Sequence, residues 1–150
     1  MSPFDAINHA VAALSTGVFS TRAESIGYYN STAIEMVTVI LMLLGSTNFF
    51  VHLLLLKGKF KEFISHCEVR LMLFLLALFV PILTVLLMNG VYSNVPVSLR
   101  AALFQAVSAL TTTGFQTVES FAAWTPAMMF LMILLMLIGG GAGSTALSLI

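Results

Sequence analysis

Three apolar runs constrain this chain most, because each is long enough, or almost long enough, to cross a bilayer as a helix. They cover residues 34–56, 69–88 and 124 to about 138. The chain of 150 residues is 59% hydrophobic and only 8% charged, with a mean hydropathy of +1.05. A soluble domain needs more charge to cover its surface. The sequence therefore predicts an all-α membrane protein.

The basic residues predict how the runs are oriented. The loop 57–68 carries Lys57, Lys59 and Lys61, whereas the connector 89–97 carries no charge. Positive charge favours the cytoplasmic side of a membrane, so we expect loop 57–68 inside and the connector outside. Segments 22–33 and 98–123 then begin and end on the outer face.

An internal repeat organises the chain. At an offset of 96, His9–Thr21 aligns without a gap to Gln105–Thr117, and seven of the thirteen positions are identical. The same offset pairs Gly45 with Gly141. The shared spacing of Thr, Phe and Thr favours a true repeat over a chance match. We therefore expect an incomplete first unit over residues 1–56 and a second unit over 69–150.

Each unit contains a short helix followed by a polar, uncharged loop. A helix that ends at Leu110 directs its negative dipole end and unpaired carbonyls toward Thr111–Gly114, which favours a cation. Threonine adds a hydroxyl, and glycine lets carbonyls turn toward one axis. Neither loop has a carboxylate at its centre, which argues against a calcium cage. The alternative is that these hydroxyls only satisfy backbone groups where helices touch.

Other classes of function fit poorly. The stretch "GGGAGST" at 139–145 lacks the lysine of a phosphate-binding P-loop. His9, His52 and His66 show no metal-ligand spacing, and the net charge of zero gives no basic surface for nucleic acid. We expect no enzyme activity and no cofactor. Glu35 could attract cations or extend to the interface, and Arg100 could meet a carboxylate or the outer water.

The motifs together resemble the Trk/Ktr/HKT superfamily of potassium transporters, specifically its bacterial TrkH-type membrane subunit. They are "STGVFSTR" at 15–22, "MLLGSTNFFVH" at 42–52, "AVSALTTTGFQT" at 106–117 and "GGGAGST" at 139–145. Members carry four helix–pore-loop–helix units arranged like a potassium channel around one pore. The resemblance implies two of those four pore loops here, with a transmembrane helix at 69–88, a pore helix and filter at 98–118, and a further transmembrane helix from 124.

The resemblance also implies the residues of the site. Phe19 and Phe115 would pack behind a filter that binds potassium only through its carbonyl oxygens. Residues 139–145 would form an intramembrane gate. The filter would comprise Ser15, Thr16, Gly17, Val18, Thr111, Thr112, Thr113 and Gly114, and the gate Gly139, Gly140, Gly141, Ala142, Gly143, Ser144 and Thr145.

One substitution departs from the family pattern, since Val18 stands where the first loop would have its filter glycine. The expected function is potassium uptake across the inner membrane, by a channel-like or symport mechanism. The expected partners are potassium, membrane lipid, a second copy of the full-length protein and a cytoplasmic nucleotide-binding regulatory subunit. The alternative is a non-transporting remnant or a structural subunit that needs other pore-loop chains.

Overall fold

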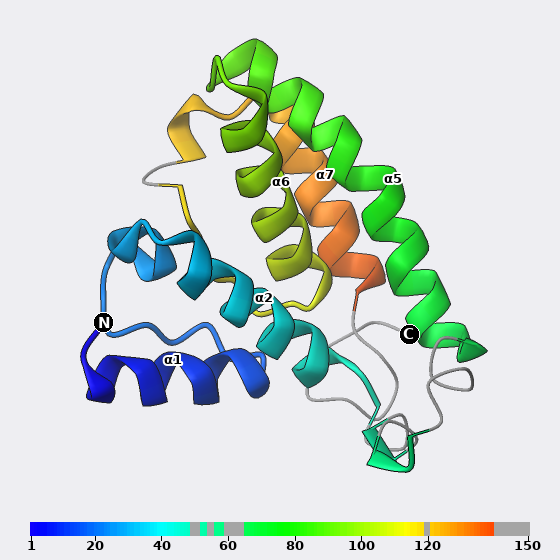
Figure 1. The fold of residues 1–150 in the computed structure, drawn as a ribbon. Helices are drawn as coiled ribbons and strands as arrows, with labels where there is room; N and C mark the ends of the chain where they lie inside the picture. Colours follow the sequence, from blue (N-terminus) through cyan, green and yellow to red (C-terminus); the bar gives the residue numbers. More distant parts are fainter. Residues whose placement is uncertain (49–51, 54–55, 59–64, 119–120, 140–150) are drawn as a thin grey trace.

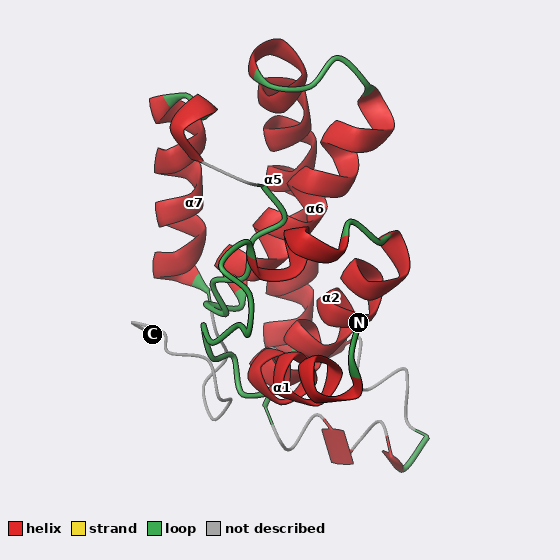
Figure 2. Ribbon diagram, turned by 90° about the vertical axis from the view of Figure 1, so that its left-hand side faces the viewer, coloured by secondary structure: helices red, strands yellow, loops and turns green. Residues whose placement is uncertain are grey.

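The computed structural model describes residues 1–48, 52–53, 56–58, 65–118 and 121–139. Every regular element in these ranges is a helix, as the sequence predicts. Figure 1 shows two groups of helices: α1 with α2, and α5 with α6 and α7. Figure 2, turned by 90°, shows the same grouping from the side.

Local signals in the sequence start helix α1 (Pro3–Leu14). Ser2 is the N-cap, and its hydroxyl accepts a hydrogen bond of 3.1 Å from the Asp5 amide. Pro3 occupies the first turn, where its missing amide hydrogen costs nothing. After a loop and the 3₁₀ helix η1 (Ser25–Tyr29), the chain enters α2.

Helix α2 (Thr32–Ser46) ends well before residue 56, the expected limit of this apolar run. The backbone becomes extended at Thr47, with φ −90° and ψ 150°. The hydroxyls of Ser46 and Thr47 donate to the carbonyls of Leu43 and Leu44, at 3.0 and 2.9 Å. These local bonds compete with helix continuation, so the polar sequence overrides the apolar run around it.

Helix α5 (Cys67–Gly90) contains the expected span 69–88 and continues through Pro81. Among the described residues it is the one helix long and apolar enough to cross a membrane. Only 28% of its most apolar 18-residue stretch is buried, whereas the core helix of a soluble protein is mostly buried. Residues 57–58 and 65–66 of the preceding loop are described, and 59–64 lie outside the described part.

Helices α6 (Val95–Leu110) and α7 (Pro126–Ile138) complete the second unit. The 3₁₀ helix η2 (Phe121–Ala123) lies between them in the chain. Helix α6 ends at Leu110, as the sequence predicts, so the polar loop after it begins at the expected position.

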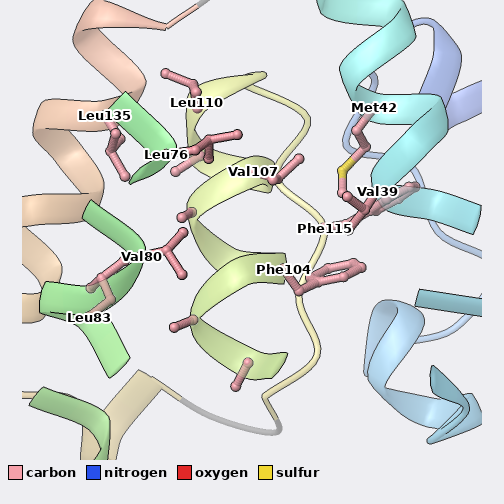
Figure 3. Close-up of a cluster of buried hydrophobic side chains, with 14 of the residues drawn as sticks. Val39, Met42, Leu76, Val80, Leu83, Phe104, Val107, Leu110, Phe115 and Leu135 are labelled. Atoms are coloured by element: carbon pink, nitrogen blue, oxygen red, sulfur yellow. The ribbon is translucent and has the colours of Figure 1, made fainter. Parts of the chain in front are cut away.

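The hydrophobic core is centred on α6, which contributes the buried side chains of Phe104 and Val107. In Figure 3, α6 lies between Leu83 of α5 on one side and Met42 of α2 on the other. Trp124 is buried and packs edge-on against Phe121, with 5.0 Å between the ring centroids. The same core therefore joins the two groups of helices.

Candidate functional site

The two polar loops predicted to hold a cation are residues 15–18 and 111–114, here called the first and second threonine loops. They follow α1 and α6 directly. In each loop the second residue has a positive φ: 50° at Thr16 and 55° at Thr112. Branching at Cβ makes this conformation unfavourable for threonine. The same strained backbone therefore recurs at positions 96 apart.

Hydrogen bonding repeats with the same offset. The amide of Gly17 donates to the Ala12 carbonyl at 2.8 Å, and the amide of Thr113 donates to the Ser108 carbonyl at 3.0 Å. The amides of Thr16 and Thr112 donate to the carbonyls three residues earlier, at 3.3 and 3.0 Å. Together with the left-handed threonine, this is the Schellman pattern that closes helices. Both helices therefore stop at the same point by the same mechanism.

The caps change one expectation about the helix ends. The sequence suggested unpaired carbonyls facing the loop, but the carbonyls of Ala12, Ala13, Ser108 and Ala109 accept the cap bonds. The carbonyls of Leu14 and Leu110, the last helical residues, lie against Gly45 and Gly139 respectively. The helix dipoles still point into the loops. Oxygen ligands for a cation would therefore come from the loops and less from the helix ends.

The second threonine loop is the more enclosed of the two. Thr111 and Thr113 are fully buried, and their hydroxyl oxygens lie 2.8 Å apart in a hydrogen bond. The Ser108 hydroxyl donates to the Phe115 carbonyl at 2.6 Å, which fastens the far end of the loop to α6. Gly114 is exposed and has a φ of 77°, a conformation that glycine adopts readily. Of the four residues, Thr112 and Gly114 therefore face accessible space.

The first threonine loop differs at the two positions after Gly17. Val18 has no positive φ, unlike its counterpart Gly114, and is 66% exposed. Phe19 is 86% exposed, whereas its counterpart Phe115 is buried in the core beside α6 (Figure 3). Within this chain the Phe115 side chain is therefore packed into the core, whereas that of Phe19 is largely exposed.

The two loops meet. A Cβ placed on Gly114 would lie 3.3 Å from both γ-carbons of Val18. Just beyond the loops, the Gly27 amide of η1 donates to the Gln116 carbonyl at 3.1 Å. Gly27 also lies so close to the Thr117 backbone that a Cβ there would be 2.9 Å from its carbonyl oxygen. The two units are thus fitted together on the side where both loops lie.

An ion pair joins the units away from the loops. Arg100 of α6 donates from Nε and from a terminal nitrogen to the two carboxylate oxygens of Glu35 in α2, at 2.6 and 2.7 Å. The Glu35 side chain is 6% exposed and that of Arg100 is 33% exposed. The sequence left the partners of Glu35 and Arg100 open, and the structure shows that the two residues pair with each other.

A polar cluster holds the return of the first loop to the start of α1. Thr21 donates to the Asp5 carboxylate at 2.7 Å, and Arg22 lies 3.6 Å from it. The hydrogen bond from Thr21 is the largest of the interactions that lower the pKa of Asp5 to about 2. His9, buried beneath the loop, contacts the Asp5 carbonyl at 2.7 Å and the Ser20 hydroxyl at 2.8 Å. His9 therefore links α1 to the returning loop. Nothing in the sequence indicated these two hydrogen-bond partners.

Only the first residue of the expected gate, Gly139, lies in the described part; residues 140–145 lie outside it. The offset of 96 pairs Gly45 with Gly141, yet Gly139 makes the contact equivalent to that of Gly45. Gly45 follows Leu14 by 31 residues and Gly139 follows Leu110 by 29. The connector of the second unit is therefore two residues shorter.

The structure contains two cavities that bear on the site. A cavity of about 690 Å³ lies between η1, α2 and the second unit, and its lining residues include Glu24, Tyr28, Glu35, Tyr92, Arg100 and Trp124. A smaller one of about 60 Å³ is lined by Ser46, Thr47, Glu68, Leu110 and Gly139, among others. Within the described ranges, no group of three or more His, Cys, Asp or Glu side chains is placed to hold a metal ion.

Comparison with known proteins identifies one family. A family model described as TrkH, cation transport protein, matches residues 1–149. The Trk system potassium uptake protein TrkH of Escherichia coli K12 is 37% identical over 147 residues, which cover 97% of this chain and 30% of that protein. Trk system potassium uptake protein TrkG of the same organism is 36% identical over 148 residues, with the same coverage. The chain thus spans less than a third of these relatives.

A solved structure agrees with the fold. The crystal structure of the potassium transporter TrkH from Vibrio parahaemolyticus matches with a TM-score of 0.88 and 35% sequence identity. The match covers 97% of this chain and 32% of that chain. The arrangement of helices and loops described above is therefore also that of a segment within a larger solved protein.

Proposed function

Because the chain belongs to the TrkH family of cation transport proteins, we propose that it forms part of a potassium-uptake pathway across the cytoplasmic membrane. The chain supplies two threonine loops, and a complete pathway needs further loops of the same kind. The relatives that support this reading are named as potassium uptake proteins, and the chain matches 30% of their length. The function is transport and involves no catalysis.

One observation carries the proposal most directly: the same cap, with a left-handed threonine, places both loops at the ends of short helices whose negative dipole ends face them. Backbone oxygens held in this way can replace part of the hydration shell of a monovalent cation. In the second loop, the hydroxyls of Thr111 and Thr113 bond to each other. Main-chain carbonyls of residues 111–114 are therefore the better candidates for ligands.

The same proposal extends to orientation and partners. The loops face the outside and the loop 57–68 faces the cytoplasm, in agreement with the positions of the lysines. The resemblance also implies a gate at residues 139–145, of which only Gly139, beside the Leu110 carbonyl, lies in the described part. Within the full-length protein, we expect a homodimer that binds a cytoplasmic nucleotide-binding regulatory subunit, with potassium the only ion held and no further cofactor.

Val18 favours a second candidate, a non-transporting remnant or structural subunit. A β-branched residue occupies the position aligned with Gly114 and does not adopt its backbone conformation. The first loop then lacks one of the carbonyl orientations available to the second.

A segment chimera tests both candidates. In this chimera the present 150 residues replace their counterpart in the TrkH of Vibrio parahaemolyticus, which they match at 35% identity. We expect the chimera to restore growth on low potassium in cells that lack their own uptake systems, and to take up rubidium in vesicles. A stably inserted chimera that stays inactive, and that Val18→Gly does not rescue, would establish the second candidate instead.

A further inference from the structure

We infer that the Glu35–Arg100 ion pair is a positioning device that fixes one threonine loop relative to the other, and thereby sets which monovalent cations pass. The inference rests on the proposed function for its consequence in transport. Its structural part, the spacing of the loops, can be measured without transport.

The geometry of the pair is specific. Two hydrogen bonds, at 2.6 and 2.7 Å, join the planar guanidinium of Arg100 to both oxygens of the Glu35 carboxylate. Such a two-point contact fixes direction as well as distance, which a lysine or a single hydrogen bond would not. Because Glu35 is almost fully buried, its side chain has little freedom to follow Arg100 if α6 shifts.

Each partner belongs to a helix that determines the position of one loop. Gly45, near the far end of α2, contacts the Leu14 carbonyl at the end of α1, and the first threonine loop starts at the next residue. Arg100 lies in α6, which ends at Leu110 immediately before the second loop. At a rise of 1.5 Å per residue, the pair is about 15 Å from the end of α6. A change at the pair would therefore tilt α6 and move its loop.

Direct attraction of cations by Glu35 is a weaker explanation. Both carboxylate oxygens already accept hydrogen bonds from a cation, and the pair is neutral as a whole. A gain in stability alone also explains little, because a buried ion pair is often no more stabilising than apolar side chains of similar volume. A fixed register between two packed units is a role that apolar side chains perform less well.

The experiment uses the segment chimera in a background with no other cysteines and with Cys67→Ser. Spin labels on Ser15→Cys, in the first loop, and on Gln116→Cys, two residues after the second loop, report the spacing of the loops. Rubidium and sodium fluxes in the unlabelled chimera report selectivity. We expect Glu35→Gln and Arg100→Gln each to broaden the distance distribution and to lower the rubidium-to-sodium flux ratio several-fold. The double exchange Glu35→Arg with Arg100→Glu should restore at least half of the ratio and narrow the distribution.

Two controls make the result decisive. Glu24→Gln removes an exposed carboxylate from the wall of the same cavity, and it should change neither quantity. Arg100→Lys keeps the charge but loses the two-point contact, so it should also broaden the distance distribution. It provides the test if Arg100→Gln does not insert into the membrane. An unchanged distance distribution in the inserted single variants would overturn the inference. An inactive parent chimera would instead contradict the proposed function, and the distances would still decide the inference.

Discussion

Gly139 lies directly against the carbonyl of Leu110, the last residue of α6. A Cβ placed on Gly139 would be 2.7 Å from the Leu110 carbonyl carbon and closer still to its oxygen. Gly45 has the same relationship to Leu14 in the first unit, where the carbonyl carbon would be 2.8 Å away. Each unit therefore uses a glycine to bring one helix onto the end of the short helix that precedes its threonine loop.

These contacts predict that Gly45→Ala is destabilising. The new methyl group would overlap main-chain atoms, which cannot move aside without shifting the end of α1, so we expect a loss of about 1–3 kcal/mol in stability. Thermal unfolding of the purified segment chimera measures it. Gly90→Ala is the matched control, because its Cβ would meet only the end of the Met128 side chain at 3.6 Å. Equal melting temperatures for the two variants would contradict the proposed overlap.

The left-handed threonines predict that one substitution to glycine raises stability. Thr16 has a φ of 50°, so Thr16→Gly removes backbone strain of about 1–2 kcal/mol. This gain should exceed the loss of the hydrogen bond from the Thr16 hydroxyl to the Ser15 carbonyl, and the segment should become slightly more stable. The neighbouring Ser15 has a φ of −83° and gains nothing from glycine, so Ser15→Gly should lower stability slightly. Chemical or thermal unfolding of Thr16→Gly and Ser15→Gly measures both effects. The prediction requires that the two substitutions change stability in opposite directions.

The sequence predicted those features that depend on local signals. The start of α1 follows from Ser2, Pro3 and Asp5, and the end of α6 at Leu110 follows from the threonines after it. The repeat was visible because both loops keep threonine at the left-handed position and phenylalanine three residues later. The family also followed from the combined motifs, and the comparisons confirm it.

Features that depend on packing could not be predicted in the same way. Glu35 and Arg100 are 65 residues apart, and nothing local indicates that they pair. Phe19 and Phe115 are the same residue at matching positions, yet within the described part of the chain only Phe115 belongs to the core. The apolar run 34–56 concealed the end of α2, because hydropathy does not register the hydroxyl bonds of Ser46 and Thr47.

The Asp5 cluster predicts a dependence of stability on pH. Its pKa is about 2 in the folded protein, below the ordinary value near 4, so its contribution is present above about pH 4 and is lost as the pH falls toward 2. Asp5→Asn should therefore destabilise the segment chimera at pH 6 and have a smaller effect near pH 3. Thermal unfolding at both values measures the difference.

A second substitution tests which interaction lowers the pKa of Asp5. Thr21→Val removes the hydroxyl that donates to Asp5 at 2.7 Å, the largest interaction lowering this pKa. The pKa of Asp5 should rise toward its ordinary value, and the pH range in which stability is lost should move upward. An unchanged range in Thr21→Val would show that the hydrogen bond does not hold the pKa down.

Val18 predicts a gain of function. Its γ-carbons lie against Gly114, and its backbone does not adopt the conformation of that glycine. Val18→Gly removes the side chain from the contact between the loops and allows a positive φ, so we expect a several-fold rise in rubidium flux relative to sodium in the segment chimera. Val18→Ala removes the γ-carbons but still disfavours a positive φ, so it distinguishes steric contact from backbone conformation. An equal rise in both variants would assign the effect to the side chain, whereas no rise in either, with insertion intact, would show that position 18 does not limit passage.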